Sequence, residues 1–195
     1  LLTPENTQFW DYVRSRGVPE DYPVMIQVET DNVHWTRPHV VIPFTHNNTI
    51  VGYSCRFLDD RIPKYINDIQ PGYVFGADLQ QESWQYVLVM EGVFDALSIS
   101  GMAVLHADIN DAQARLIRSL GKEIIVVPDQ DKAGRQLVER AINFGWSVSF
   151  PEWENCKDIT DATLKYGRLF TIYSILNSVE HSPTKIKLLA RRLGV

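Results

Sequence analysis

The chain has 195 residues, of which 45% are hydrophobic and 22% are charged. This is the balance of an ordinary globular protein, and the length allows one domain or two small ones. No apolar run approaches the roughly 20 residues that span a bilayer, so no membrane association is expected. The net charge of −5 excludes a globally basic surface, so any contact with phosphate must come from a local basic patch or a bound metal ion.

The two cysteines, Cys55 and Cys156, stand far apart in the sequence. Neither belongs to a CxxC pair, which excludes a zinc finger or zinc ribbon. A reduced, cytoplasmic setting is therefore expected. The first residues do not have the pattern of a signal or transit peptide, and the absence of an initiator Met fits a chain cut from a longer one.

The first 83 residues predict one helix followed by hairpin strands. Pro4 lies in the first turn of a predicted helix over residues 4–16, and Gly17 ends it. Runs of β-branched residues predict strands over residues 24–28, 39–44 and 49–58, with turn residues between the last two. From residue 59 to residue 83 turn residues dominate, and no helix is predicted. We expect a smaller α+β subdomain with antiparallel strands over residues 1–83.

From Tyr86 the pattern changes to apolar strands that alternate with helices. This order builds a mostly parallel sheet flanked by helices, so an α/β domain is expected over residues 84–178. Residues 184–195 predict a short amphipathic helix that has four basic residues and no acid, within a basic tail or linker over residues 179–195. The predicted strands are residues 86–90, 102–105, 123–128 and 146–150, and the predicted helices are residues 94–100, 110–120 and 132–144.

Acidic residues follow two of the predicted parallel strands. Glu91 follows the first strand, and Asp129 and Asp131 follow the third. Ligands of parallel α/β sheets bind beyond these carboxyl ends, and residues two apart in an extended segment point the same way. Clustered carboxylates repel one another unless a cation neutralises them, and oxygen ligands suit Mg²⁺ or Mn²⁺. Asp95 lies one helical turn after Glu91 and is a further candidate ligand.

A simpler interpretation of these acids is helix capping. Asp129 and Asp131 precede the predicted helix that begins at Lys132, where negative charge stabilises the helix N-terminus. Each acid taken alone fits this role as well as a metal site. The set of three at two strand ends favours the metal site.

Two motifs resemble the Toprim family. Residues 91–95 read Glu-Gly-Val-Phe-Asp and resemble its EGxxD element, and residues 129–134 read Asp-Gln-Asp-Lys-Ala-Gly and resemble its DxDxAG element. Residues 157–161, Lys-Asp-Ile-Thr-Asp, resemble a later acidic motif of primases. The resemblance implies a Toprim-type fold with an acidic site in which Glu91, Asp129 and Asp131 hold the metal. It also implies Asp95 and Asp158 as additional or supporting ligands, together with Asp161.

The segment before these motifs resembles the RNA-polymerising core of bacterial and phage DNA primases. Residues 50–58 end in a strand that carries Arg56, and residues 63–67 read Pro-Lys-Tyr-Ile-Asn, similar to a PKYLN element. The resemblance covers about residues 40–165 and implies that Arg56, Lys64 and Asn67 line a basic ridge for template and nucleotide. Exposed solvated charges are the alternative for Arg56 and Lys64. The chain departs from the family in two places. Residues 53–55 stand where the family has glycines, and residues 70–73 stand where the family has a further basic residue.

The resemblance implies synthesis of short RNA primers on single-stranded DNA from ribonucleoside triphosphates. Lys132, Arg135 and Lys157 would then meet nucleotide phosphates, although helix-surface charge is an equal alternative for Lys132 and Arg135. A replicative helicase and a zinc-binding module are the further partners expected. The alternatives are a Toprim nuclease that uses the metal to activate water, and a non-catalytic DNA-binding Toprim module. A topoisomerase is disfavoured because it needs a distant tyrosine nucleophile and a longer chain.

Overall fold

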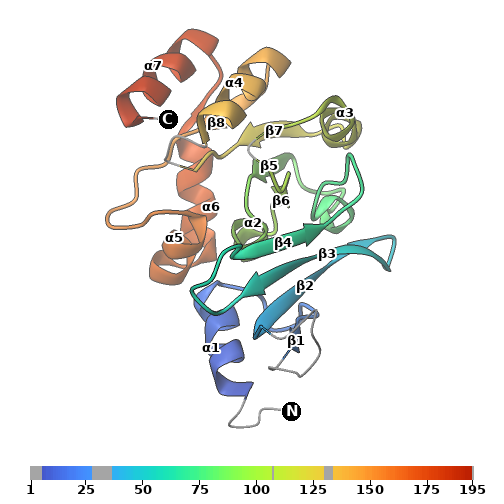
Figure 1. The fold of residues 1–195 in the computed structure, drawn as a ribbon. Coiled ribbons are helices and arrows are strands. Elements are labelled where there is room, and N and C mark those ends of the chain that lie inside the picture. The colour runs from blue at the N-terminus through green and yellow to red at the C-terminus, as the bar shows by residue number, and fades with distance from the viewer. Residues whose placement is uncertain (1–5, 28–36, 107, 130–133, 195) are drawn as a thin grey trace. The chain divides into compact units, whose positions relative to one another are not determined.

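The computed structural model describes residues 6–27, 37–106, 108–129 and 134–194 (Figure 1). The chain divides into two compact units, Leu1–Gln70 and Pro71–Val195. This division lies earlier in the chain than the boundary expected after residue 83. In the described ranges no helix has both the length and the apolar character needed to cross a bilayer.

The first unit is a helix with a four-stranded antiparallel sheet. Helix α1 (Thr7–Ser15) buries Phe9 and Val13, and the sheet has the order β1-β2-β3-β4. Asn47 and Asn48 connect β2 to β3 with positive φ angles of 49° and 60°, which asparagine tolerates in tight hairpin turns. The antiparallel hairpins expected from the sequence are therefore confirmed. The strands are β1 (Met25–Gln27), β2 (His39–His46), β3 (Thr49–Phe57) and β4 (Tyr65–Asp68).

Strand β4 and one short helix lie in the segment for which only turns were predicted. Tyr65–Asp68 pairs along β3, although all four of its side chains are exposed. With no buried face, this strand lacks the alternation of apolar and polar residues from which strands are usually predicted. A single 3₁₀ turn, η2 (Ala77–Leu79), follows in the second unit.

The second unit contains a five-stranded sheet with the order β6-β5-β7-β8-β9. Strands β6, β5, β7 and β8 pair in parallel with one another, and β9 pairs antiparallel with β8. A mostly parallel sheet was expected, and the structure confirms it. The strands are β5 (Tyr86–Met90), β6 (Met102–Ala103), β7 (Glu123–Val126), β8 (Ser147–Ser149) and β9 (Val179–Glu180).

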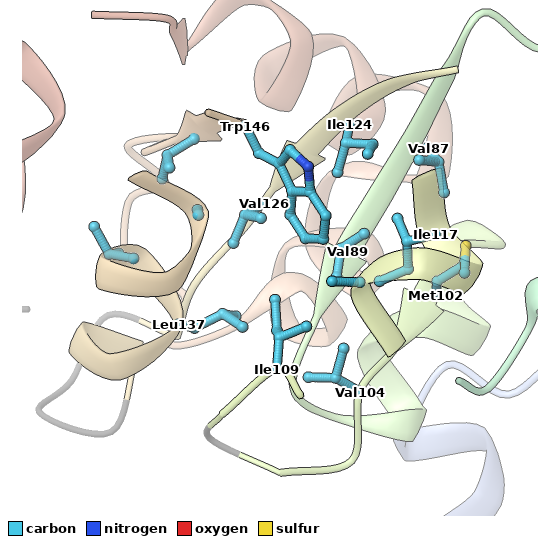
Figure 2. Close-up of a cluster of buried hydrophobic side chains, with 14 of the residues drawn as sticks. Val87, Val89, Met102, Val104, Ile109, Ile117, Ile124, Val126, Leu137 and Trp146 are labelled. Carbon is cyan, nitrogen blue, oxygen red and sulfur yellow. The ribbon is translucent and has the colours of Figure 1, made fainter. Parts of the chain in front are cut away.

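Helices cover both faces of this sheet. Alternate residues of β5 and β7, including Val89 and Val126, face a core shared with Ile117 of α3 (Asp111–Ser119) and Leu137 of α4 (Gly134–Phe144). Figure 2 shows these side chains together with Trp146. The opposite face carries α2 (Val93–Ile99), α5 (Ile159–Tyr166) and α6 (Arg168–Asn177), which pack against one another. Helix α3 begins with the expected capping box, in which the side chains and backbones of Asn110 and Gln113 bond reciprocally.

The C-terminal segment belongs to this core. Helix α7 (Pro183–Leu193) was expected as an amphipathic helix, and the structure confirms it. Its buried residues Ile186 and Ala190 are part of the same cluster as Val138 of α4. Figure 1 shows α7 beside α4, so the segment is packed within the second unit.

Candidate metal and nucleic-acid sites

Two candidate acids follow neighbouring strands at the same edge of the parallel sheet. Val89 of β5 pairs with Val126 of β7, and the Val127 N–H donates to the Val89 carbonyl at 2.8 Å. Glu91 and Asp129 lie just beyond these pairs, and both are half-buried. Carboxyl ends of parallel strands are where ligands bind in such sheets. The register therefore brings these two acids to one edge.

The glycine of the second acidic motif lies against the backbone of Asp129. A Cβ atom added to Gly134, at the first position of α4, would collide with the Asp129 carbonyl oxygen. Only glycine allows the helix to begin this close to the strand end. Gly134 therefore sets the path of the chain next to Asp129.

Asp95 is bound to the start of a distant helix. Its side chain is 6% exposed, and its Oδ1 accepts bonds from both the backbone N–H and the hydroxyl of Thr160 at 2.9 Å. Thr160 is fully buried in the first turn of α5. Asp95 thus connects the helix that follows Glu91 to the helix that follows Asp158.

The third acidic motif forms the N-terminus of α5. Asp158 is the N-cap, and its Oδ1 accepts the Asp161 N–H at 2.8 Å. Asp161 in turn accepts the Lys157 N–H at 3.2 Å. Lys157 and Asp158 line a small recess together with Asp129, so two of the acidic motifs share one depression. Capping and proximity to Asp129 are both properties of Asp158 in this structure.

The donor chemistry at this edge fits a hard divalent cation. Glu91, Asp129 and Asp158 offer carboxylate oxygens, the ligands that Mg²⁺ and Mn²⁺ prefer. In the part of the chain that the structure describes, no cluster of three or more His, Cys, Asp or Glu side chains is close enough to bind a metal ion. The predicted ligand Asp131 and the predicted phosphate contact Lys132 lie outside the described residues.

Arg56 is held between aromatic rings in the first unit. Its guanidinium carbon lies 4.5 Å from the centre of the Tyr65 ring and 5.8 Å from that of Tyr12. Among the described residues its buried Nε has no hydrogen-bond partner, so the ring contacts help to orient the side chain. Burial, reinforced by the neighbouring Tyr65, raises the pKa of Tyr12 to about 12, so Tyr12 stays neutral beside the cation.

The pairing of β3 with β4 relates Arg56 to Asn67. Arg56 lies opposite Tyr65, and Ser54 lies opposite Asn67. Residues two apart on a strand point to the same face, so Arg56 and Asn67 share one face of the sheet. Lys64 is exposed just before β4, and its carbonyl accepts the Phe57 N–H at 3.0 Å. The structure therefore brings the three predicted template contacts to one strand pair.

Arg135 lies on a different surface from the acids. It is exposed on α4, pairs with Glu139 at 3.1 Å, and lines a groove between α4 and α7. The groove also contains Lys187 and Arg191. Its contribution to a site is therefore separate from the recess at Asp129.

Comparison with known proteins identifies the domain that carries the acids. Residues 88–163 match the family model described as Toprim-like. The match covers the end of β5, all of β7 and the three acidic motifs, as the resemblance implied.

The fold of the chain is that of primase catalytic cores. The crystal structure of the Aquifex aeolicus primase, with zinc-binding and RNA polymerase domains, gives a TM-score of 0.70 at 21% identity, over 89% of this chain and 56% of that one. A DnaG primase catalytic domain bound to single-stranded DNA gives 0.68 at 19% identity, over 91% and 76%. A DNA primase of Clostridium acetobutylicum is 20% identical over 88% of this chain and 33% of its own length. The chain thus spans about a third of that relative.

Two contacts around the predicted residues were not expected from sequence. Thr160 binds Asp95, although the two are far apart in the chain, and Tyr65 stacks on Arg56 across a strand pair. Tyr65 belongs to the Pro-Lys-Tyr motif at residues 63–65, and this motif was the sequence feature that could have pointed to its contact with Arg56. Neither pairing follows from local periodicity, because each depends on tertiary register.

Proposed function

We propose that this chain is a primase catalytic core that joins ribonucleotides into short RNA primers on a single-stranded DNA template. The observation that carries the proposal is that Glu91 and Asp129 follow two paired parallel strands, within the residues that match the Toprim-like model. The primase folds of the structural neighbours support the same activity. One of these neighbours was solved with single-stranded DNA, which supports a DNA template for this chain.

Glu91 and Asp129, with Asp131 and Asp158, would hold one or two Mg²⁺ or Mn²⁺ ions. Such an ion would supply charge that lowers the pKa of a bound hydroxyl and offsets charge on the triphosphate. Glu91 and Asp129 each follow a buried strand, which constrains the backbone from which their carboxylates extend. Asp95 acts through Thr160, since that bond fixes the α5 N-terminus where Asp158 and Lys157 lie.

The cations have separate tasks. Lys157, at the Asp129 recess, would meet nucleotide phosphates, and Lys132 would assist it. Arg56, Lys64 and Asn67 would bind the template, with the phosphate backbone as the main contact of the two cations. The two tyrosine rings beside Arg56 would restrict its guanidinium and so favour a directional contact.

The test is primer synthesis by the purified chain on single-stranded DNA, with labelled ribonucleotides and Mg²⁺ or Mn²⁺. We expect short RNA from the wild type. Glu91→Gln and Asp129→Asn keep the size of the side chain but remove a charge. Each should lower the rate by more than the roughly 10–100-fold that loss of an outer ligand partner costs.

Asp111→Asn provides a matched control, because Asp111 is an exposed acid in the first turn of α3. It should retain wild-type synthesis. Unchanged synthesis in both Glu91→Gln and Asp129→Asn would overturn the site. Metal-dependent cutting of DNA without incorporation of nucleotides would instead identify a nuclease.

A further inference from the structure

A groove lies between α4 and α7 in the second unit. It has a volume of about 560 Å³ and is lined on the α4 side by Arg135 and Glu139 and on the α7 side by Lys187 and Arg191. Both helices also contribute to the buried cluster, which fixes the two walls of the groove relative to each other. Figure 1 shows the two helices side by side.

The charge in this groove is positive. The one acid that lines it within the described ranges, Glu139, already pairs with Arg135 at 3.1 Å. Lys187 and Arg191 are exposed, and no ion pair or hydrogen bond of either side chain is found among the described residues. Two cations therefore face the groove with their charge uncompensated.

The remaining cations of α7 are different. Lys185 lies 3.6 Å from Glu180, and Arg192 lies 3.2 Å from Glu152. Neither lines the groove. A helix with four cations and no acid thus divides them into a pair with acidic partners and a pair that points into the groove.

We infer that the α4–α7 groove binds the phosphodiester backbone of nucleic acid, at a site additional to the template face around Arg56. The inference rests on the proposed function for the identity of the ligand. Lys187 and Arg191 are one helical turn apart on the same side of α7, a spacing that lets them contact neighbouring phosphates. With a net charge of −5, the chain has no global attraction for DNA, so a local concentration of cations carries the contact.

A membrane surface fits this helix less well. A basic amphipathic helix binds a bilayer through its apolar face. In α7 the apolar residues Ile186 and Ala190 are buried in the protein core, at 1% and 6% exposure, and Leu188 is the large apolar side chain of the helix that is exposed, at 60%. The groove carries charged side chains on both walls, Arg135 and Glu139 on α4 and Lys187 and Arg191 on α7, which fits a strand of phosphates.

The experiment compares two double variants of the full chain. Lys187→Ala with Arg191→Ala removes the groove cations, and Lys185→Ala with Arg192→Ala removes the paired ones. Each loses one Lys and one Arg, so the change in net charge is identical. Binding of labelled single-stranded DNA and of a labelled duplex is measured by fluorescence anisotropy over a series of salt concentrations. Circular dichroism checks that both variants fold.

We expect the groove variant to bind on the order of 10-fold more weakly at about 0.1 M salt. Its slope of log affinity against log salt should fall by about 1.4 on single strands, or about 1.8 on duplex, for two lost contacts. The probe with the larger loss identifies which form of DNA lies in the groove. Lys187→Arg with Arg191→Lys should restore the affinity.

Equal losses in the two double variants, or wild-type binding by the groove variant, would overturn the inference. An acidic protein segment in the groove would give the second result. Primer synthesis is assayed separately. A wild type that makes no primers, yet binds DNA through the groove, would refute the proposed function and leave the inference standing.

Discussion

Gly134 shows how a single residue controls the candidate site through the backbone. Its Cα lies so close to the Asp129 carbonyl that a methyl group has no space. Gly134 is also buried, so the surrounding atoms leave little space for a larger residue. The position of Asp129 therefore depends on a residue that has no side chain to contribute.

We predict that Gly134→Ala lowers both stability and primer synthesis. Overpacking a close contact costs roughly 1–3 kcal/mol, and displacement of the carbonyl would move Asp129 out of the proposed metal site. Urea unfolding measures the first effect and the primer assay measures the second. Gln136→Ala, at an exposed position of the same helix, is the control and should leave both unchanged. Wild-type behaviour of Gly134→Ala would show that the strand end is more adaptable than this contact implies.

Sequence alone predicted which acids follow strands, because strand, turn and acid are adjacent in the chain. Glu91 and Asp129 are at the predicted positions after β5 and β7. The hydrogen bonds of Asp95 were not predictable, since its partner Thr160 lies on a helix for which no pattern was recognised. The catalytic roles of Glu91, Asp129 and Asp95 stay predictions.

At the scale of elements, a cluster of ion pairs connects the residues just before β2 with those just after β3. Asp59, after β3, accepts bonds from Arg37, which precedes β2, and from Arg61. The Arg37 guanidinium also stacks 3.8 Å above the Phe57 ring. The cluster therefore fixes the chain on both sides of the strand pair that carries Arg56.

The stability contributed by this cluster should depend on pH. The two guanidinium groups hold the pKa of Asp59 far below its usual value. A group with a lowered folded pKa stabilises the fold above the unfolded pKa, which is about 4 for aspartate, and loses that contribution as the pH falls toward the folded value. Asp59→Asn should therefore be less stable than wild type at pH 7, and the difference should shrink below about pH 4.

Thermal melts at neutral and acid pH measure this difference. Asp60→Asn is the matched control, because Asp60 is the exposed neighbouring residue and makes the same change in charge. It should follow the wild type at both values. A gap between Asp59→Asn and wild type that is constant across pH would exclude the ion cluster as its cause.

Elements with strong periodicity were predicted well, and those without it were not. The parallel sheet follows from apolar strands that alternate with capped helices, as at Asn110. Strand β4 has four exposed side chains, and α6 exposes Leu169 and Tyr173, so neither has a one-sided apolar pattern. Such elements are fixed by tertiary pairing, which local sequence does not encode.

On the scale of the whole molecule, metal binding should be visible as stability. A ligand that binds only the folded state stabilises it by about 1.4 kcal/mol at a concentration of ten times the dissociation constant. For a chain of this size we predict a rise in the melting temperature of about 3–6 °C on addition of Mg²⁺ or Mn²⁺ at that level. Asp129→Asn should show little of this rise. Calorimetry at matched ionic strength makes the measurement, and equal shifts in both proteins would locate the metal elsewhere.

The adjacency of β5 and β7 has a consequence for recognising related chains. Helix α2, strand β6 and helix α3 intervene between the two strands in sequence, yet the strands are hydrogen-bonded neighbours. Gly121 lies in the connection between α3 and β7, so an insertion there is expected to leave the pairing of the two strands unchanged. An insertion between Val126 and Asp129 turns the acid toward the other face. Searches for distant homologues should therefore allow any number of residues between the two motifs. They should require a constant number of residues between each strand end and the carboxylate that follows it.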